Sequence, residues 1–120
     1  TKEISVMANN FKNAFATSVS TNSSSPTTVY TANNGTAVNS ILIELDVANT
    51  GSSGITVSVV LYDNSGTASY HIVKNAPIPS GGTLKVVSGQ KVVLNGDDQV
   101  RVYASANTVD VIASILEDVA

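Results

Sequence analysis

The clearest feature of the chain is the alternation of apolar and polar residues in short runs. Residues 38–48 form the longest run. One face of this run is apolar and consists of Ile41, Ile43, Leu45 and Val47. The other face is polar apart from Leu42. Because successive side chains of a strand point to opposite faces, this pattern predicts a strand that packs one face on a core.

Shorter runs of the same kind recur along the chain. They predict strands over residues 14–22, 27–32, 55–62, 69–74, 84–87, 92–94, 100–105 and 109–116. The segments between them carry turn residues, as in Asn33-Asn34-Gly35-Thr36, Asp63-Asn64-Ser65-Gly66 and Ser88-Gly89-Gln90. Pro77 and Pro79 lack the N–H that a central strand needs, so they predict an extended corner before the turn at Gly81 and Gly82.

About eight or nine strands at intervals of roughly 8–12 residues predict an all-β fold. We expect an antiparallel β-sandwich, jelly-roll or Greek-key like, with about eight strands in residues 14–120. Residues 1–13 follow neither a helical nor a strand period, so we expect an N-terminal arm. This arm is either an edge strand or flexible terminus, or a segment that docks on a neighbouring subunit, where Phe11 and Phe15 would be buried.

Several apolar and aromatic side chains fall on faces that are predicted to point outward. They are Leu42, Val60, Tyr62, Tyr103, Ile112 and Leu116. Two interpretations remain open. Either the side chains converge in a patch that subunit association buries, because a monomer rarely exposes a large apolar patch, or a β-bulge shifts the register by one residue and turns them inward.

The composition narrows the class of function. Only 12% of the residues are charged, the net charge is −3, and the 6 Lys and Arg cannot form the basic surface that nucleic-acid binding needs. No apolar run is long enough to span a membrane. The chain has no Cys, which excludes disulfides, thiolate metal sites and thiol redox chemistry.

No residue pattern predicts a reaction, a metal site, a cofactor or a small-molecule substrate. His71 is the only histidine and has no carboxylate at catalytic spacing. Asp97 and Asp98 are more typical of a turn than of a calcium site. Glu44 and Asp46 share one face of a predicted strand, which is more typical of a solvated or partner-facing surface than of a glycosidase carboxylate pair. We therefore expect that the chain is not an enzyme.

Several segments, taken in order, carry a family resemblance. They include Ala48-Asn49-Thr50-Gly51, Lys74-Asn75-Ala76-Pro77-Ile78-Pro79-Ser80-Gly81-Gly82, Val92-Val93-Leu94-Asn95-Gly96-Asp97, Val100-Arg101-Val102-Tyr103-Ala104-Ser105 and Ser114-Ile115-Leu116-Glu117. Over residues 27–118 this pattern resembles small β-sandwich virion structural proteins of tailed bacteriophages. Such proteins occur as capsid decoration proteins and as tail or fibre components.

The resemblance implies a non-enzymatic capsid decoration (cement) protein, which binds the outer head surface and stabilises contacts between capsid subunits. Its partners would be the major capsid protein and copies of itself in a homo-oligomer such as a trimer. It would bind neither nucleic acid nor a membrane. It would lie on the phage particle and assemble in the host bacterial cytoplasm. The residue pattern itself provides the candidates for partner binding: Phe11 and Phe15 for contact with a neighbour, and the outward set described above for self-association.

Two alternatives to a decoration protein remain. One is a tail or fibre structural module. The other is a carbohydrate-binding β-sandwich module, which needs exposed aromatic side chains; the chain has no Trp, and its tyrosines are Tyr30, Tyr62, Tyr70 and Tyr103.

Overall fold

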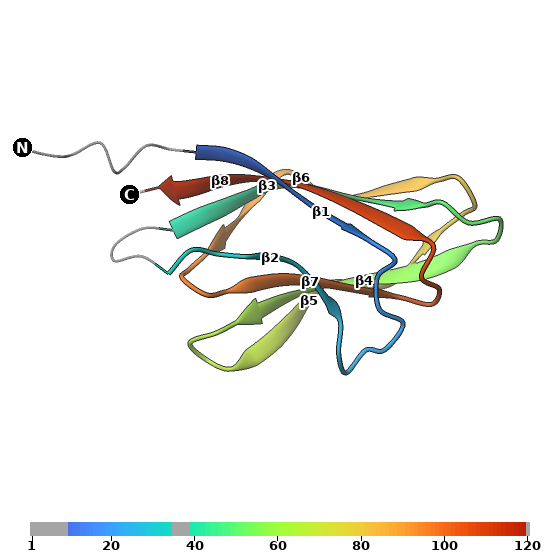
Figure 1. Ribbon diagram of the computed structural model, residues 1–120, viewed down its shortest axis with the longest axis horizontal. Helices are drawn as coiled ribbons and strands as arrows, with labels where there is room; N and C mark the ends of the chain where they lie inside the picture. The colour runs from blue at the N-terminus through green and yellow to red at the C-terminus, as the bar shows by residue number, and fades with distance from the viewer. Residues whose placement is uncertain (1–9, 35–38, 120) are drawn as a thin grey trace, which may run out of the picture.

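The chain folds into two β-sheets that pack face to face (Figure 1). This computed structural model describes residues 10–34 and 39–119. The strands are β1 (Asn10–Thr17), β2 (Thr27–Thr31), β3 (Asn39–Asn49), β4 (Ile55–Asp63), β5 (Ala68–Ile78), β6 (Thr83–Leu94), β7 (Gln99–Ala104) and β8 (Val109–Val119). The predicted all-β antiparallel sandwich is confirmed. Within the described ranges, no helix is long and apolar enough to cross a membrane.

The strand order is that of a jelly roll. One sheet has the order β1-β8-β3-β6 and the other has the order β2-β7-β4-β5. The first strand pairs with the last, the second with the seventh, the third with the sixth and the fourth with the fifth, all antiparallel. The chain is therefore a long antiparallel ribbon whose successive strand pairs alternate between two packed layers.

Aliphatic side chains fill the space between the two sheets. Val111, Ala113 and Ile115 of β8 are at most 1% exposed, and Val100 and Val102 of β7 are fully buried. They alternate with outward-pointing residues, as the sequence predicts. Full burial of one such Val or Ile side chain contributes about 1.5–3 kcal/mol, so this alternation is a main source of stability.

The prediction for the first half of β3 is wrong. Leu42, which was expected to point outward, is fully buried, whereas Ile41 is half-buried on the outer surface. The ladder skips Ile43 between Leu42 and Glu44 on both neighbouring strands. This β-bulge adds one residue to β3 and so reverses the inward and outward positions that precede it. For Leu42, the register shift is the correct interpretation.

Two predicted breaks lie inside continuous strands. β6 runs through Ser88-Gly89-Gln90, where the sequence indicates a turn; its register to β3 shifts there, and Gly89 has a φ of 94°. β5 continues through Pro77 and ends at Ile78. Pro77 is tolerated because β5 is the edge strand of its sheet, where only one side of the strand is paired and Pro is commonly found.

β1 begins at Asn10 rather than at residue 14, and it ends at Thr17 rather than at residue 22. Residues 10–13, which were expected in the arm, pair with β8. Phe11 and Phe15 are therefore both strand residues. Residues 1–9 of the predicted arm, and Gly35 and Thr36 of the predicted turn, lie outside the described residues.

Candidate interaction surfaces

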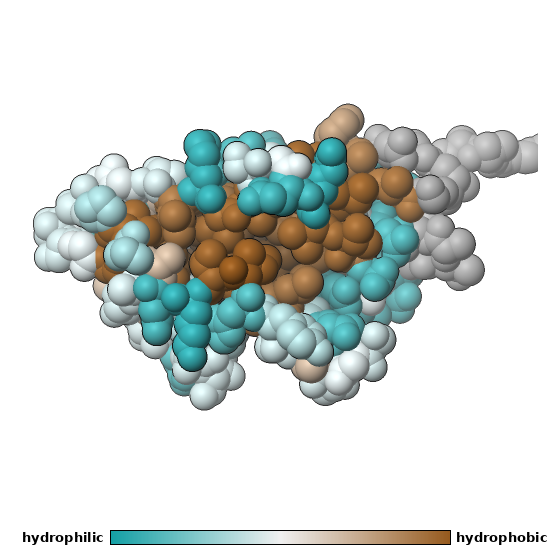
Figure 2. Space-filling model, turned by 180° about the vertical axis from the view of Figure 1, so that it is seen from behind, coloured by the Kyte–Doolittle hydropathy of each residue, from teal (hydrophilic) through white to brown (hydrophobic). Residues whose placement is uncertain are grey.

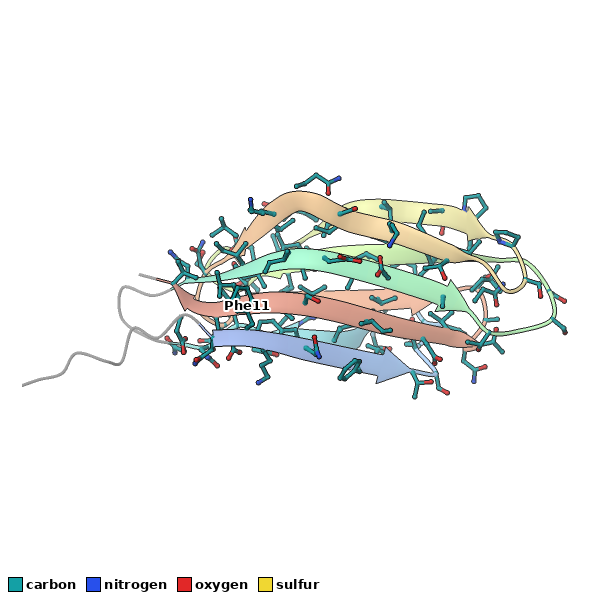
Figure 3. The ribbon with its side chains drawn as sticks, turned by 90° about the horizontal axis from the view of Figure 1, so that it is seen from above. Phe11 is labelled. Atoms are coloured by element: carbon teal, nitrogen blue, oxygen red, sulfur yellow. The ribbon has the colours of Figure 1, made fainter. Side chains whose placement is uncertain are left out.

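An apolar row crosses the outer surface of the β1-β8-β3-β6 sheet. Phe11 pairs with Leu116, Leu116 pairs with Ile41, and Ile41 pairs with Val93. Figure 3 looks down onto this sheet and labels Phe11 on β1. Phe15 of β1 and Ile112 of β8 form a second apolar pair on the same surface. Together these residues form the outer apolar face, which consists of Phe11, Phe15, Ile41, Val93, Ile112 and Leu116.

Much of the outer apolar face is open to solvent. Phe11 is 79% exposed and Phe15 is 65% exposed, while Val93 and Ile112 are each more than half exposed. Single exposed apolar side chains are common on proteins, but a row of four apolar cross-strand neighbours, with a further apolar pair beyond Asn13 and Ser114, is typical of a surface that another molecule covers. Exposed aromatic residues are also the side chains that most often dominate binding energy at interfaces.

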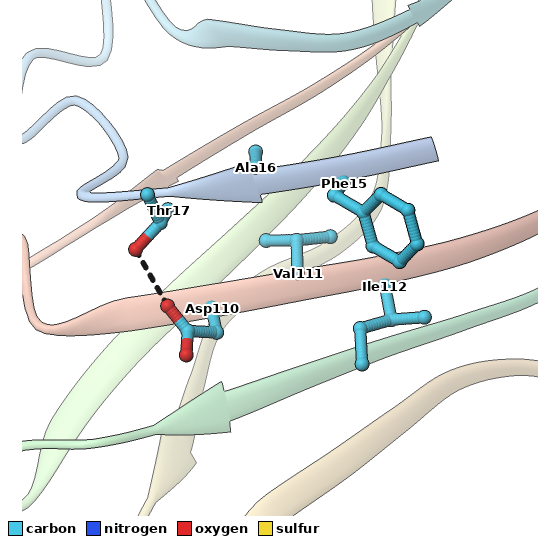
Figure 4. Close-up of a pocket in the computed structure, with 6 residues that line it drawn as sticks. All are labelled: Phe15, Ala16, Thr17, Asp110, Val111 and Ile112. Atoms are coloured by element: carbon cyan, nitrogen blue, oxygen red, sulfur yellow. Dashed lines mark hydrogen bonds between the residues drawn. The ribbon is translucent and has the colours of Figure 1, made fainter. Parts of the chain in front are cut away.

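A shallow hollow of about 510 Å³ opens between β1 and β8 on this surface (Figure 4). Phe15 and Ile112, which are cross-strand partners, line its apolar side. Thr17 and Asp110 line its polar side, where Thr17 Oγ1 donates a hydrogen bond of 2.6 Å to Asp110 Oδ1. An apolar wall beside a polar pair suits a partner side chain with an apolar body and a polar tip.

Charged residues cross the same sheet beside the apolar row. Glu44 and Asp46 share one face, as predicted: Lys85 Nζ lies 3.6 Å from Glu44 Oε2 and 3.7 Å from Asp46 Oδ1. Asp46 Oδ1 is buried and accepts no hydrogen bond from the described residues, so the Lys85 ammonium group is the charge that offsets it. Two carboxylates and one shared cation form a surface cluster with one negative charge in excess, in which Lys85 offsets part of the repulsion between the carboxylates.

A second apolar surface lies along the side of the sandwich between β5 and β6. These strands are edge strands of different sheets and make few contacts with each other. Side chains at this margin of the core therefore stay partly exposed, and Figure 2 shows them as a hydrophobic band along the molecule. We call this surface the open flank; it consists of Ile72, Val73, Ala76, Leu84 and Val92.

The outer surface of the β2-β7-β4-β5 sheet carries aromatic and cationic side chains. The Arg101 guanidinium carbon lies 4.1 Å from the ring centroid of Tyr62. His71 Nε2 and Tyr103 Oη form a hydrogen bond of 2.9 Å. Val60 lies between Arg101 and His71 in the ladder, so it faces outward as predicted, yet its neighbours cover it and it is only 4% exposed. We call these five residues the aromatic face.

The acidic turn after β6 has a structural role. Asp98 is buried, and its Oδ1 and Oδ2 accept hydrogen bonds of 3.0 Å from the backbone N–H groups of Asn64 and Asn95. Both carboxylate oxygens thus tie two turns together, in agreement with the turn interpretation. Among residues 10–34 and 39–119, no group of three or more His, Cys, Asp or Glu residues could hold a metal ion.

Sequence reasoning missed a polar cluster that is buried at one end of the sandwich. Tyr30 Oη donates a hydrogen bond to Glu117 Oε2 and lies 3.4 Å from Ser40 Oγ. Lys12 Nζ lies 3.7 Å from the same Glu117 oxygen. Burial and the hydrogen bond to Glu117 raise the pKa of Tyr30 from 10.0 to about 12. Glu117 follows buried Ile115 by two positions, so the alternation in β8 was a signal that this carboxylate points inward.

The eight predicted partner-binding residues separate into three groups. Those on the outer apolar face are Phe11, Phe15, Ile112 and Leu116. Those on the aromatic face are Val60, Tyr62 and Tyr103, and Leu42 lies in the core. Ile41 was missed because of the bulge, and Val93 because both residues of the pair Val92-Val93 are apolar.

No known protein family, curated protein or solved structure matches this chain.

Proposed function

We propose that this chain is a non-enzymatic structural protein of a bacteriophage virion that acts as a capsid decoration (cement) protein. The observation that carries the proposal is the outer apolar face. It places Phe11, which is largely exposed, in line with Leu116, Ile41 and Val93 across a four-stranded sheet. Phe15, also largely exposed, pairs with Ile112 on the same surface. The exposed part of such a surface contributes little to the stability of the isolated chain and becomes useful when another protein covers it.

The fold and the charge distribution support the same proposal. Jelly-roll sandwiches recur in viral capsid proteins and in lectins, although a fold alone does not define a function. Only 12% of the residues are charged. Beside the outer apolar face, the carboxylates of Glu44 and Asp46 already share Lys85. Docking on this side would therefore desolvate few unpaired charges, which are the costly groups to bury.

In this mechanism the outer apolar face binds the outer surface of the head, and the hollow beside Phe15 receives a side chain of the major capsid protein. The open flank joins copies of the chain in a homo-oligomer. Complete burial of a Phe side chain contributes about 1.5–3 kcal/mol, part of which offsets the lost freedom of the bound protein. Repeated at many lattice positions, this binding raises the barrier to separation of the capsid subunits.

The test mixes the purified protein with empty heads assembled from the major capsid protein of the phage that encodes it. Co-sedimentation measures attachment, and the temperature of head rupture measures reinforcement. The double variant Phe11→Ser, Phe15→Ser should weaken attachment by at least about tenfold, because it removes apolar area worth more than about 1.4 kcal/mol. Tyr70→Ser is the matched control, since Tyr70 is a 59% exposed aromatic residue on β5 in the other sheet.

Protein that stays in solution, with heads that rupture at an unchanged temperature, would contradict the decoration role. Equal attachment by the double variant and the control would show that the outer apolar face is not the docking surface. Electron microscopy of labelled particles separates the remaining candidate: label on the tail or fibres would make the chain a tail or fibre module that uses the same surface.

A further inference from the structure

The aromatic face points away from the outer apolar face and takes no part in the docking proposed above. The ladder places two rows of side chains across its four strands. The first row is Thr28, Arg101, Val60 and His71, and the second is Thr31, Gln99, Tyr62 and Ser69. Both rows consist of hydroxyl, amide, aromatic and cationic groups around one valine, and neither contains a carboxylate.

The side chains of this face are held in place before any ligand arrives. Arg101 Nε donates a hydrogen bond of 2.7 Å to Gln99 Oε1, and its guanidinium lies over the ring of Tyr62. The rings of His71 and Tyr103 meet edge to face, with centroids 5.9 Å apart. Side chains that are fixed in advance lose little conformational entropy on binding, which favours recognition by a flat surface.

Among the described residues, Arg101 has no acidic partner. In the described part of the chain, the ion pairs involve Lys12 and Lys85, and no carboxylate oxygen lies within 4.0 Å of Arg101. This is notable in a chain with a net charge of −3. The Arg101 guanidinium stacks on Tyr62, and its Nε–H bonds to Gln99. The N–H groups of its two terminal nitrogens remain, and their spacing matches the two oxygens of a carboxylate.

We propose that the aromatic face binds an acidic saccharide, whose carboxylate pairs with Arg101 and whose ring lies against Tyr103. The aromatic ring covers the apolar C–H face of the sugar. Gln99 Oε1 already accepts hydrogen bonds from Thr28 and Arg101, so the Thr31 hydroxyl and the Gln99 side-chain NH₂ group are the groups in these rows that would bind sugar hydroxyls. Small molecules usually bind in clefts. The rows of side chains on this face run across an open sheet, so they fit an extended polysaccharide better than a small molecule. A single arginine cannot form the phosphate track of a nucleic-acid site.

Calorimetric titration of the isolated full chain tests this site. The ligands are a tetragalacturonate and its methyl ester, which is neutral and otherwise alike. The acid should bind at least about tenfold more tightly than the ester, and Arg101→Gln should weaken binding of the acid by a similar factor. Lys91→Gln is the matched control, because it removes the same charge from an exposed position on β6 in the other sheet and should change nothing.

Thermal unfolding establishes that each variant is folded. If Arg101→Gln does not fold, Arg101→Lys takes its place: it keeps the charge but loses the planar fork, and binding should fall several-fold. Three results would overturn the proposal. They are no binding of acidic oligosaccharides built on galacturonate, glucuronate or sialic acid, equal binding by the arginine variant, and equal competition by inorganic phosphate or single-stranded DNA. None of these measurements involves phage heads, so the result is independent of the decoration role.

Discussion

The bulge in β3 makes opposite predictions for two adjacent residues, and this provides a sharp test of the fold. Leu42 is fully buried, and its ladder partners are Ile115 on β8 and Val92 on β6. Ile41 is half-buried on the outer apolar face. An uninterrupted strand would reverse these positions and place Ile41 in the core. Truncation of each residue to alanine therefore distinguishes the two registers.

The expected costs differ by several kcal/mol. Leu→Ala at fully buried sites costs about 2.7–5 kcal/mol, because the lost apolar transfer energy adds to the cost of the cavity. Ile41→Ala removes atoms that already contact water, so it should lower the free energy of unfolding by no more than about 1 kcal/mol. Urea titration followed by far-UV circular dichroism measures both. With a slope of about 2 kcal/mol/M, Leu42→Ala should shift the midpoint by about 1.3 M or more.

Attachment to heads should show the reverse order. Ile41→Ala should weaken docking while the protein stays stable, because Ile41 belongs to the outer apolar face. If Leu42→Ala does not fold, Leu42→Val is compared with Ile41→Val, since each removes a single methylene. The change at buried Leu42 should cost about 1 kcal/mol and the change at Ile41 less. A larger loss of stability from the Ile41 variant than from the matched Leu42 variant would refute the bulged register, and with it the apolar row.

Three further predictions concern polar groups. Because the pKa of Tyr30 rises from 10.0 in the unfolded chain to about 12 in the fold, the folded state keeps a proton that the unfolded state loses. The contribution of Tyr30 to the free energy of unfolding, on the order of 2 kcal/mol, is complete below pH 10 and is lost as the pH rises to 12. In urea titrations, Tyr30→Phe should abolish this alkaline loss of stability, whereas Tyr70→Phe, at an exposed tyrosine, should not. Asp98→Ala leaves two backbone N–H groups without their acceptor and should lower the free energy of unfolding by about 2–4 kcal/mol, measured in the same way. Lys85→Ala should lower the free energy of unfolding by no more than about 1 kcal/mol at low salt. The loss should be smaller in about 1 M salt, because screening weakens the repulsion between Glu44 and Asp46 that the missing lysine leaves uncompensated.

Alternation predicts the fold well where a strand is regular. In β8 every second residue from Val109 to Ile115 is buried, and Ile112 and Leu116 point outward as predicted. The same rule fails in β3, because strict alternation assumes a regular strand and does not show where a bulge inserts a residue. A warning was present all the same: Leu42 is an apolar residue on a face that is otherwise polar.

Other features depend on information that a local pattern does not contain. Whether Pro77 can lie inside a strand depends on whether that strand is at the edge of a sheet, which only the topology decides. His71 looks isolated in the sequence because its partner, Tyr103, is two strands away across β4. The alternation places Tyr103 on an outward face, but only the strand order brings these rings together.

The two outer surfaces of the sandwich differ in chemistry, and the strand order explains why they remain independent. Phe11 and Phe15 lie on the β1-β8-β3-β6 sheet, while Arg101 and Tyr103 lie on the β2-β7-β4-β5 sheet. The buried core separates the sheets, so a molecule docked through the first sheet keeps the second exposed. A protein repeated on a lattice would then present many copies of a weak saccharide site, and binding at one site raises the effective concentration at the next. Weak affinity of the isolated chain for a sugar would therefore be compatible with firm attachment of a decorated particle.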